Sequence, residues 1–394
     1  MRSLGLRGPR SVELSYIPIL TVSTWRLTCP SLPRYNADLK RSLICFTRRY
    51  LSSDTKERNS TTNQIPVDLF FSDDERDLLK SALLRVSENP YSAFSHFDEH
   101  IKRIIATDAV TDRFRKLCEQ KCSGDIYEDP YVLMKNCPVD DELPKLSFDT
   151  PVIDKRNLKK TYVAEGFLLL YARLMQQEPV GYINVNDGDI FQDIHPMRRM
   201  AQTQSQKALD TIFFHKDLAN HFVRPDWVNI LGLRASPANE ILTSFVKNKD
   251  LLEALSTETK DILRQEVFYT PYDDLTTSSE HKELGQAPNH RILGGATDYD
   301  FRFFENRTVG LNDQACEVIS DVLATMHSLK RPLLISKGDF IGSANNECVH
   351  NKEVTRIGDP DAQQNRWLMK TVNVRRLDVH QQHMVEGQVR IVNG

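Results

Sequence analysis

The chain has 394 residues, of which 40% are hydrophobic and 27% are charged, and its formal net charge is −3. This balance is typical of a soluble globular protein, and it lacks the general basic character that a nucleic-acid partner favours. No run of about 18 uncharged apolar residues occurs, so we expect no membrane span. The seven cysteines are odd in number and irregularly spaced, which predicts free thiols in a reducing compartment.

The first fifty residues are rich in arginine and serine, and their only acids are Glu13 and Asp38. This composition is typical of a mitochondrial transit peptide, and "RRYLSS" (48–53) resembles a processing site. A disordered extension or an unused upstream start codon are the alternatives, and both leave a cytoplasmic location open. We predict that residues 1–60 form an N-terminal extension with a candidate transit peptide and a polar linker, and that residues 61–394 form a single domain.

The segment 61–178 is predicted to be mainly helical. "SDDERDLLKSALLRV" begins with a serine and acids, followed by leucines at helical spacing, which is typical of a capped helix start. "AFSHFDEHIKRIIATDAVTDRFRKLCEQKC" continues this pattern. "TYVAEGFLLLYARLMQQ" (161–177) is apolar enough to be a buried helix.

The pattern changes near residue 179, after which short β-type runs separated by turn residues dominate. Two helices are predicted among them, "NEILTSFVKNKDLLEALS", broken near residue 248, and "NDQACEVISDVLATMHSL". Strands and helices alternate too poorly for a parallel doubly wound sheet. The expected fold class is therefore α+β, with a double-stranded β-helix, or jelly roll, in residues 179–394 and flanking helices.

The motif "FFHKD" places His215 and Asp217 two residues apart at the end of an apolar run. Residues i and i+2 of a strand point to the same side, so both side chains can reach one metal. A third ligand is offered by His350, which we expect at the end of another strand. Two histidines and one carboxylate suit a non-haem Fe(II) centre that keeps positions open for co-substrate and dioxygen. An HxD pair also occurs often by chance, where a strand runs into a polar turn.

Two features near the C-terminus strengthen this interpretation. "LLISKGDFIGSANNECVH" reads as two strands joined by a Gly-Asp turn, followed by the histidine. In "NRWLMKTVNV", Arg366, Leu368 and Lys370 fall on one face of a strand, opposite Trp367 and Met369. A buried guanidinium there can bind a carboxylate through two parallel hydrogen bonds. The alternative for Arg366 is a surface ion pair, and for Trp367 a place in the core.

These motifs resemble those of the Fe(II)- and 2-oxoglutarate-dependent oxygenases of the TauD-like superfamily, in the branch that holds clavaminate synthase and the arginine and asparagine β-hydroxylases. The resemblance covers roughly residues 160–380. It implies that His215, Asp217 and His350 bind iron. It also implies that Arg366, with Thr243 as a second contact, binds 2-oxoglutarate.

The sequence departs from the pattern of this branch at two positions. Asp217 stands where glutamate is common, and Lys370 stands where a second arginine is frequent. Lys370 corresponds to a residue that contacts co-substrate or substrate in relatives. In "MAQTQSQ", Gln204 and Ser205 match positions where relatives keep polar residues facing the substrate.

The resemblance implies a dioxygenase that couples the decarboxylation of 2-oxoglutarate by O2 to the hydroxylation of a small molecule, with a free amino acid as the expected substrate class. A same-fold oxygenase acting on a sulfonate, a betaine or a carnitine precursor is the first alternative. A non-catalytic jelly-roll binding protein is the second, and an intact ligand set with Arg366 disfavours it. Neither the substrate nor the oligomeric state follows from the sequence.

Overall fold

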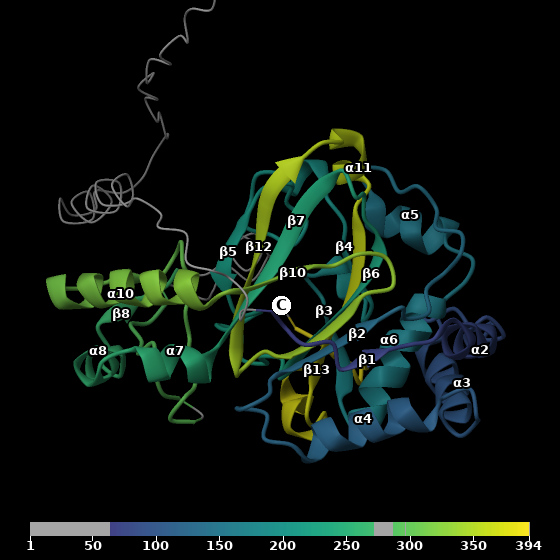
Figure 1. The fold of residues 1–394 in the computed structure, drawn as a ribbon, viewed down its shortest axis with the longest axis horizontal. Helices are drawn as coiled ribbons and strands as arrows, with labels where there is room; N and C mark the ends of the chain where they lie inside the picture. The colour runs from purple at the N-terminus through teal and green to yellow at the C-terminus, as the bar shows by residue number, and fades with distance from the viewer. Residues whose placement is uncertain (1–63, 272–286, 296, 394) are drawn as a thin grey trace, which may run out of the picture. The chain divides into compact units, whose positions relative to one another are not determined.

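The computed structural model describes residues 64–271, 287–295 and 297–393. The predicted transit peptide and most of the predicted linker lie outside these residues. Figure 1 shows two β-sheets that lie against each other, with helices covering both outer surfaces. No helix in the described ranges is long and apolar enough to cross a membrane.

The larger sheet carries the strands that begin and end the described chain. Its order is β1-β2-β11-β6-β13-β3-β14, and β4 also pairs with β13. The bounds are β1 Leu69–Phe70, β2 Tyr131–Lys135, β3 Glu178–Tyr182, β4 Gln192–Ile194, β6 Trp227–Arg234, β11 Phe340–Ala344, β13 Trp367–Val374 and β14 Ile391–Val392. Most neighbours pair antiparallel, whereas β1–β2 and β14–β3 are parallel.

The smaller sheet has the order β10-β7-β12-β5, and all its neighbours are antiparallel. The bounds are β5 Ile212–His215, β7 Asn239–Lys247, β10 Arg331–Leu334 and β12 Cys348–Ile357. A separate two-stranded sheet pairs β8 (Phe268–Tyr269) with β9 (Val309–Gly310). The two main sheets form the predicted jelly roll.

The interior between the two sheets is defined by strand alternation. Ile230 on β6, Leu368 on β13 and Phe245 on β7 belong to one buried cluster although they come from opposite sheets. Their sequence neighbours Leu231 and Met369 pack instead against helices. Because alternate residues face alternate sides, Arg366 and Lys370 share the inward face with Leu368, as the sequence predicted.

Helices of the N-terminal half cover the outer face of the larger sheet (Figure 1). Their bounds are α2 Asp73–Leu83, α3 Phe94–Ile105, α4 Asp112–Ser123, α5 Pro151–Leu158 and α6 Val163–Leu174. Ser72 caps α2 in a reciprocal capping box with Glu75, which confirms the predicted start signal. Nearly all residues of α6 are buried, as expected from its apolar sequence.

A second group of helices covers the outer face of the smaller sheet. The bounds are α7 Asn248–Ala254, α8 Thr257–Leu263 and α10 Asp313–Leu329. Phe214, Val246 and Val349 point outward from three strands and pack in one cluster with these helices. A short helix, α11 (Pro360–Gln364), and 3-10 turns at 186–188, 198–200 and 378–383 complete the described elements.

Two sequence predictions were wrong in this region. "NEILTSFVK" forms strand β7 rather than the first half of a helix, which begins only at Asn248. The segment lies between β10 and β12, and its inward residues Ile241 and Phe245 alternate with the others, so sheet pairing overrides its helix-like composition. His350 is the third residue of β12 rather than the last residue of a strand.

Candidate metal centre and co-substrate site

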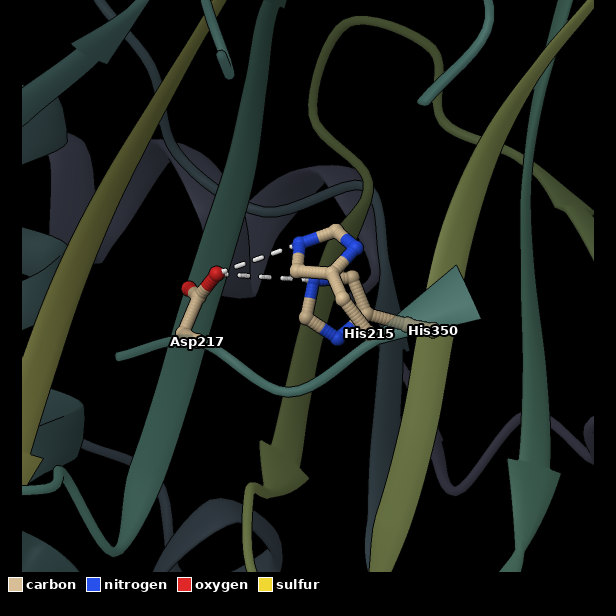
Figure 2. Close-up of side chains that lie close together, drawn as sticks. All are labelled: His215, Asp217 and His350. Atoms are coloured by element: carbon tan, nitrogen blue, oxygen red, sulfur yellow. Dashed lines mark ion pairs between the residues drawn. The ribbon is translucent and has the colours of Figure 1, made fainter. Parts of the chain in front are cut away.

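Strand pairing brings three candidate ligands together. His215 ends β5, Asp217 follows two residues later, and His350 lies directly opposite His215 in the antiparallel β5–β12 pair. One ligand atom from each residue lies within 4.8 Å of the other two. Figure 2 shows both imidazole rings turned toward the same carboxylate. The structure therefore assembles the trio that the sequence singled out.

The two histidines turn their Nε2 atoms toward the centre. Nε2 of His215 lies 3.4 Å, and Nε2 of His350 3.9 Å, from Oδ1 of Asp217. Nδ1 of His215 lies 2.8 Å from the carbonyl oxygen of Phe213, which can only accept, so the ring donates there and its orientation is fixed. Burial lowers the pKa of His350 to about 3, so this ring is neutral at physiological pH.

Asp217 is ionised and firmly oriented. Burial opposes its ionisation, but the pKa of Asp217 is held well below its ordinary value, with the attraction of Lys370 as the leading cause. Nζ of Lys370 donates to Oδ2 of Asp217 at 2.8 Å, on the side away from the oxygen that faces the histidines. Leu218, the next residue, has a left-handed φ of 51°, which for a side chain of this size costs on the order of 1–3 kcal/mol.

The backbone of Asp217 is held by a neighbouring hairpin. The amide side chain of Asn345, in the turn between β11 and β12, accepts from the Asp217 N–H at 3.0 Å and donates to its carbonyl at 3.0 Å. Nζ of the buried Lys216 donates to the carbonyl of Asn346 at 2.6 Å in the same turn. The hairpin that carries His350 therefore also fixes the segment that carries Asp217.

This donor set fits the ion that the sequence predicts. Two imidazoles and one carboxylate offer three ligand atoms from one side, an arrangement used by non-haem Fe(II) oxygenases. No other group of three or more histidines, cysteines and acids within ligand distance occurs among the described residues.

Arg366 lies just before β13 and is buried at 7% exposure. Its Nη2 has no hydrogen-bond partner among the described residues, and burial lowers the pKa of Arg366 to about 10. A small cavity of about 10 Å³ beside it is also lined by Asn239 and Ile241 of β7, so the guanidinium faces the smaller sheet. The alternative of a surface ion pair does not hold among the described residues, and Arg366 is the buried cation that the sequence predicted.

Thr243 and Lys352 lie on strands facing this guanidinium. Thr243 is buried on β7, on the same face as Ile241 and Phe245. Lys352 lies on β12, two residues beyond His350 and on the same face. Burial, followed by the repulsion of Arg366, lowers the pKa of Lys352 to about 7. The i, i+2 spacing that connects His215 and Asp217 also connects His350 and Lys352, so the sequence carries a signal for this lysine.

Lys370 occupies a different part of the interior from Arg366. Four strand residues separate them, or roughly 13 Å along β13. Lys370 therefore lies at the metal centre rather than beside the guanidinium. Gln192 of β4 stands directly opposite Lys370, is 2% exposed, and has an Nε2 without a partner among the described residues. No motif in the sequence indicates Gln192.

The two residues predicted to contact substrate form hydrogen bonds with the backbone of β5 and of the segment just before it. Gln204 accepts from the Phe213 N–H at 3.0 Å and donates to the Thr211 carbonyl at 3.1 Å. Oγ of Ser205 accepts from the Lys207 N–H at 3.3 Å. Both residues thus support the segment that precedes His215, and their predicted contact with substrate stays a prediction.

Comparison with known proteins adds sequence relatives. No family model matches the chain. An L-asparagine oxygenase of Streptomyces coelicolor is 26% identical over 245 residues, which is 62% of this chain and 70% of that protein. Clavaminate synthase 2 of Streptomyces clavuligerus is 28% identical over 135 residues, which is 34% of this chain and 40% of that protein.

Solved structures share the fold. Asparagine oxygenase in complex with Fe(II), 3-hydroxyasparagine and succinate matches with a TM-score of 0.69 and 20% identity, covering 83% of this chain and 99% of that one. The non-heme iron oxygenase OrfP in complex with Fe and alpha-ketoglutaric acid matches with a TM-score of 0.67 and 18% identity, covering 82% and 99%. These similarities confirm the predicted jelly-roll fold.

Together the fold, the metal-binding trio and the sequence relatives define the class of protein. That class is the clavaminate synthase-like Fe(II)- and 2-oxoglutarate-dependent oxygenases, to which this chain is similar in sequence and in fold. These similarities agree with the predicted family, enzyme class and cofactors.

Proposed function

We propose that this protein is a dioxygenase that hydroxylates a free amino acid, with Fe(II) bound by His215, Asp217 and His350 and with 2-oxoglutarate as co-substrate. One observation carries the proposal. Three potential ligands and a buried arginine without a carboxylate partner share the interior between two sheets. A non-catalytic jelly roll would gain nothing from keeping a buried cation without a counter-ion, since such a charge is costly.

Different residues would bind the metal, the co-substrate and the substrate. His215, Asp217 and His350 would hold the iron on one side, which leaves the opposite positions for ligands that exchange. Arg366 and Thr243 would bind the distal carboxylate of 2-oxoglutarate and so set its orientation. Bound iron supplies the activation of dioxygen, which is coupled to co-substrate decarboxylation. The apolar neighbours of the site, such as Phe245 and Leu368, exclude water and fix the reacting C–H bond.

The amino-acid substrate is supported by the names of the relatives and by the groups near the metal. An asparagine oxygenase is a sequence relative, and OrfP has been solved with hydroxylated arginine. Nζ of Lys370 carries three protons, of which one is engaged by Asp217. Its remaining donors and the amide of Gln192 opposite it can bind a substrate carboxylate. Asp217 is shorter than the glutamate found in relatives, so it reaches less far toward the ammonium group of the substrate. Other groups, with Gln204 and Ser205 as candidates, must therefore contribute more to binding that ammonium group than in those relatives.

The test begins with anaerobic addition of Fe(II) and 2-oxoglutarate to the full chain, followed by the visible charge-transfer absorption of the complex. Succinate release is then screened against the common amino acids, and against the decarboxylated amine and the N-acylated form of each active one. We expect turnover of a free amino acid and far slower turnover of both analogues, because a site built for polar groups rejects ligands that lack them. Equal rates on amino acid and amine, or turnover only with a sulfonate or a betaine, would contradict the amino-acid assignment.

A further inference from the structure

We infer that Lys352 is a second cation of the 2-oxoglutarate site, and that it binds the distal carboxylate of the co-substrate together with Arg366. The inference rests on the proposed function and adds a residue to it. Nothing in the sequence comparison pointed to this lysine. It follows from strand register, burial and charge.

Register places Lys352 among the groups of the site. In the β12–β7 pair, His350 stands opposite Phe245 and Glu353 opposite Leu242. Two steps along β12 from His350 and two steps back along β7 from Phe245 therefore bring Lys352 opposite Thr243. Directly opposite residues of an antiparallel pair face the same side with Cβ atoms about 5 Å apart. Lys352 thus shares the interior with His350 and Thr243.

The charge of Lys352 has little compensation within the protein. Its side chain is 9% exposed, and its Nζ donates to the carbonyl of Ala208 at 2.6 Å. No acid of the described residues forms an ion pair with Lys352. Nη2 of Arg366 is itself without a partner among the described residues. Two neighbouring buried cations that repel each other need an anion between them.

A carboxylate satisfies both cations at once. Its two oxygens carry about four lone pairs, enough for the guanidinium, the ammonium and the Thr243 hydroxyl together. Lys352 lies on the same strand as His350, two residues away, so the strand that carries an iron ligand would also contact the far end of the co-substrate. Metal and co-substrate would then be positioned by one rigid element, which favours a fixed distance between them.

Replacing Lys352 should have opposite effects on the stability of the ligand-free protein and on its affinity for 2-oxoglutarate. Lys352→Met removes a buried cation that is repelled by Arg366, so the melting temperature of the ligand-free protein should stay equal or rise. The same change should weaken 2-oxoglutarate binding about 10- to 100-fold, the range for a charged hydrogen bond. A merely structural lysine would lower the melting temperature and leave the affinity for 2-oxoglutarate unchanged.

The experiment uses the full chain loaded anaerobically with Ni(II), which gives a binding readout without turnover. Calorimetry compares 2-oxoglutarate with 2-oxopentanoate, which has the same five-carbon chain and lacks the distal carboxylate. We expect Lys352→Met to weaken only 2-oxoglutarate, and Lys352→Arg to restore most of its affinity. Lys247→Met, a lysine of the same sheet that contacts Glu128 instead, is the matched control and should change neither affinity.

Each outcome decides a different claim. If metal-loaded wild type does not bind 2-oxoglutarate, the proposed function fails. If it binds but Lys352→Met binds equally well, or if the variant weakens both oxo acids alike, Lys352 is not a distal-carboxylate partner and the inference is overturned. Should Lys352→Met not fold, Lys352→Gln keeps a donor for the Ala208 carbonyl, removes the charge, and is read by the same two criteria.

Discussion

At the residue scale, the buried guanidinium of Arg366 gives the most direct test of the co-substrate site. Arg366→Ala should raise the 2-oxoglutarate concentration required for half-maximal binding steeply, because removing one partner of a buried charged pair costs about 3–5 kcal/mol. Iron binding should persist, since Arg366 is not among the candidate ligands. Titration with 2-oxoglutarate after metal loading measures this effect. An unchanged requirement would show that another cation holds the co-substrate.

Glu347 offers a test by pH. This residue lies in the β11–β12 turn, and burial raises its pKa to about 7 from an ordinary value of 4.5, against the attraction of Lys216 and Arg375 and with the repulsion of Asp226 and Asp300. A raised carboxyl pKa contributes stability that is fully present below about pH 4.5 and is lost as the pH rises through about 7.

The matching variant is Glu347→Gln, which keeps the shape and removes the titration. We expect the free energy of unfolding of wild type relative to this variant to fall by about 1–3 kcal/mol between pH 4.5 and pH 8. Urea unfolding of both proteins at the two pH values measures the difference, in which groups common to both cancel. Glu99→Gln on the exposed face of α3 should show no such trend. A constant difference between wild type and Glu347→Gln would contradict the assignment.

At the scale of elements, the β11–β12 hairpin is the part that joins the metal-binding segments. It carries His350 on β12, and its turn residue Asn345 holds the Asp217 backbone by two hydrogen bonds and the Pro225 carbonyl by a third, at 2.9 Å. The ligand trio therefore depends on the contact between this hairpin and the segment after β5, and not on β5 and β12 alone.

Asn345→Ala should weaken metal binding although Asn345 is not a ligand. The change leaves buried backbone groups without partners, which costs about 2–4 kcal/mol in stability and frees the Asp217 segment. Ni(II) affinity by calorimetry and unfolding by urea measure both effects. Asn346→Ala is the matched control, because Lys216 binds the backbone carbonyl of Asn346, which this change keeps. Equal metal affinity in the two variants would rule out the positioning role.

At the scale of the whole molecule, the described residues include every residue assigned to the site, from Gln192 to Lys370. We therefore predict that removing residues 1–53 leaves Ni(II) and 2-oxoglutarate affinities unchanged. Mitochondrial localisation stays a prediction, because the candidate transit peptide lies outside the residues that the structure describes. Calorimetry on the shortened protein measures the affinities, and the N-terminal sequence of protein recovered from mitochondria tests the processing near 48–53. Loss of folding on truncation would show that this segment belongs to the domain.

The sequence by itself determined the parts of this protein that depend on local spacing. The i, i+2 placement of His215 and Asp217, the alternation of Arg366 with Trp367, and the capped start of α2 all follow from the geometry of single strands and helices. The inward face of β13 and the identity of the candidate ligands were therefore predictable. His350 was chosen because it lies at an expected strand end, and the resemblance to known motifs then supported it, since no local rule connects it to a residue 135 positions earlier.

Only the tertiary structure decided which distant groups meet. "NEILTSFVK" is a strand because β10 and β12 pair with both of its edges, and its local composition did not reveal those partners. Lys370 binds Asp217, and Lys352 stands opposite Thr243, because strands far apart in the sequence pair around a shared interior. These charged side chains are buried away from water. The groups that they can bind therefore depend on their neighbours in space, and not on their positions in the sequence.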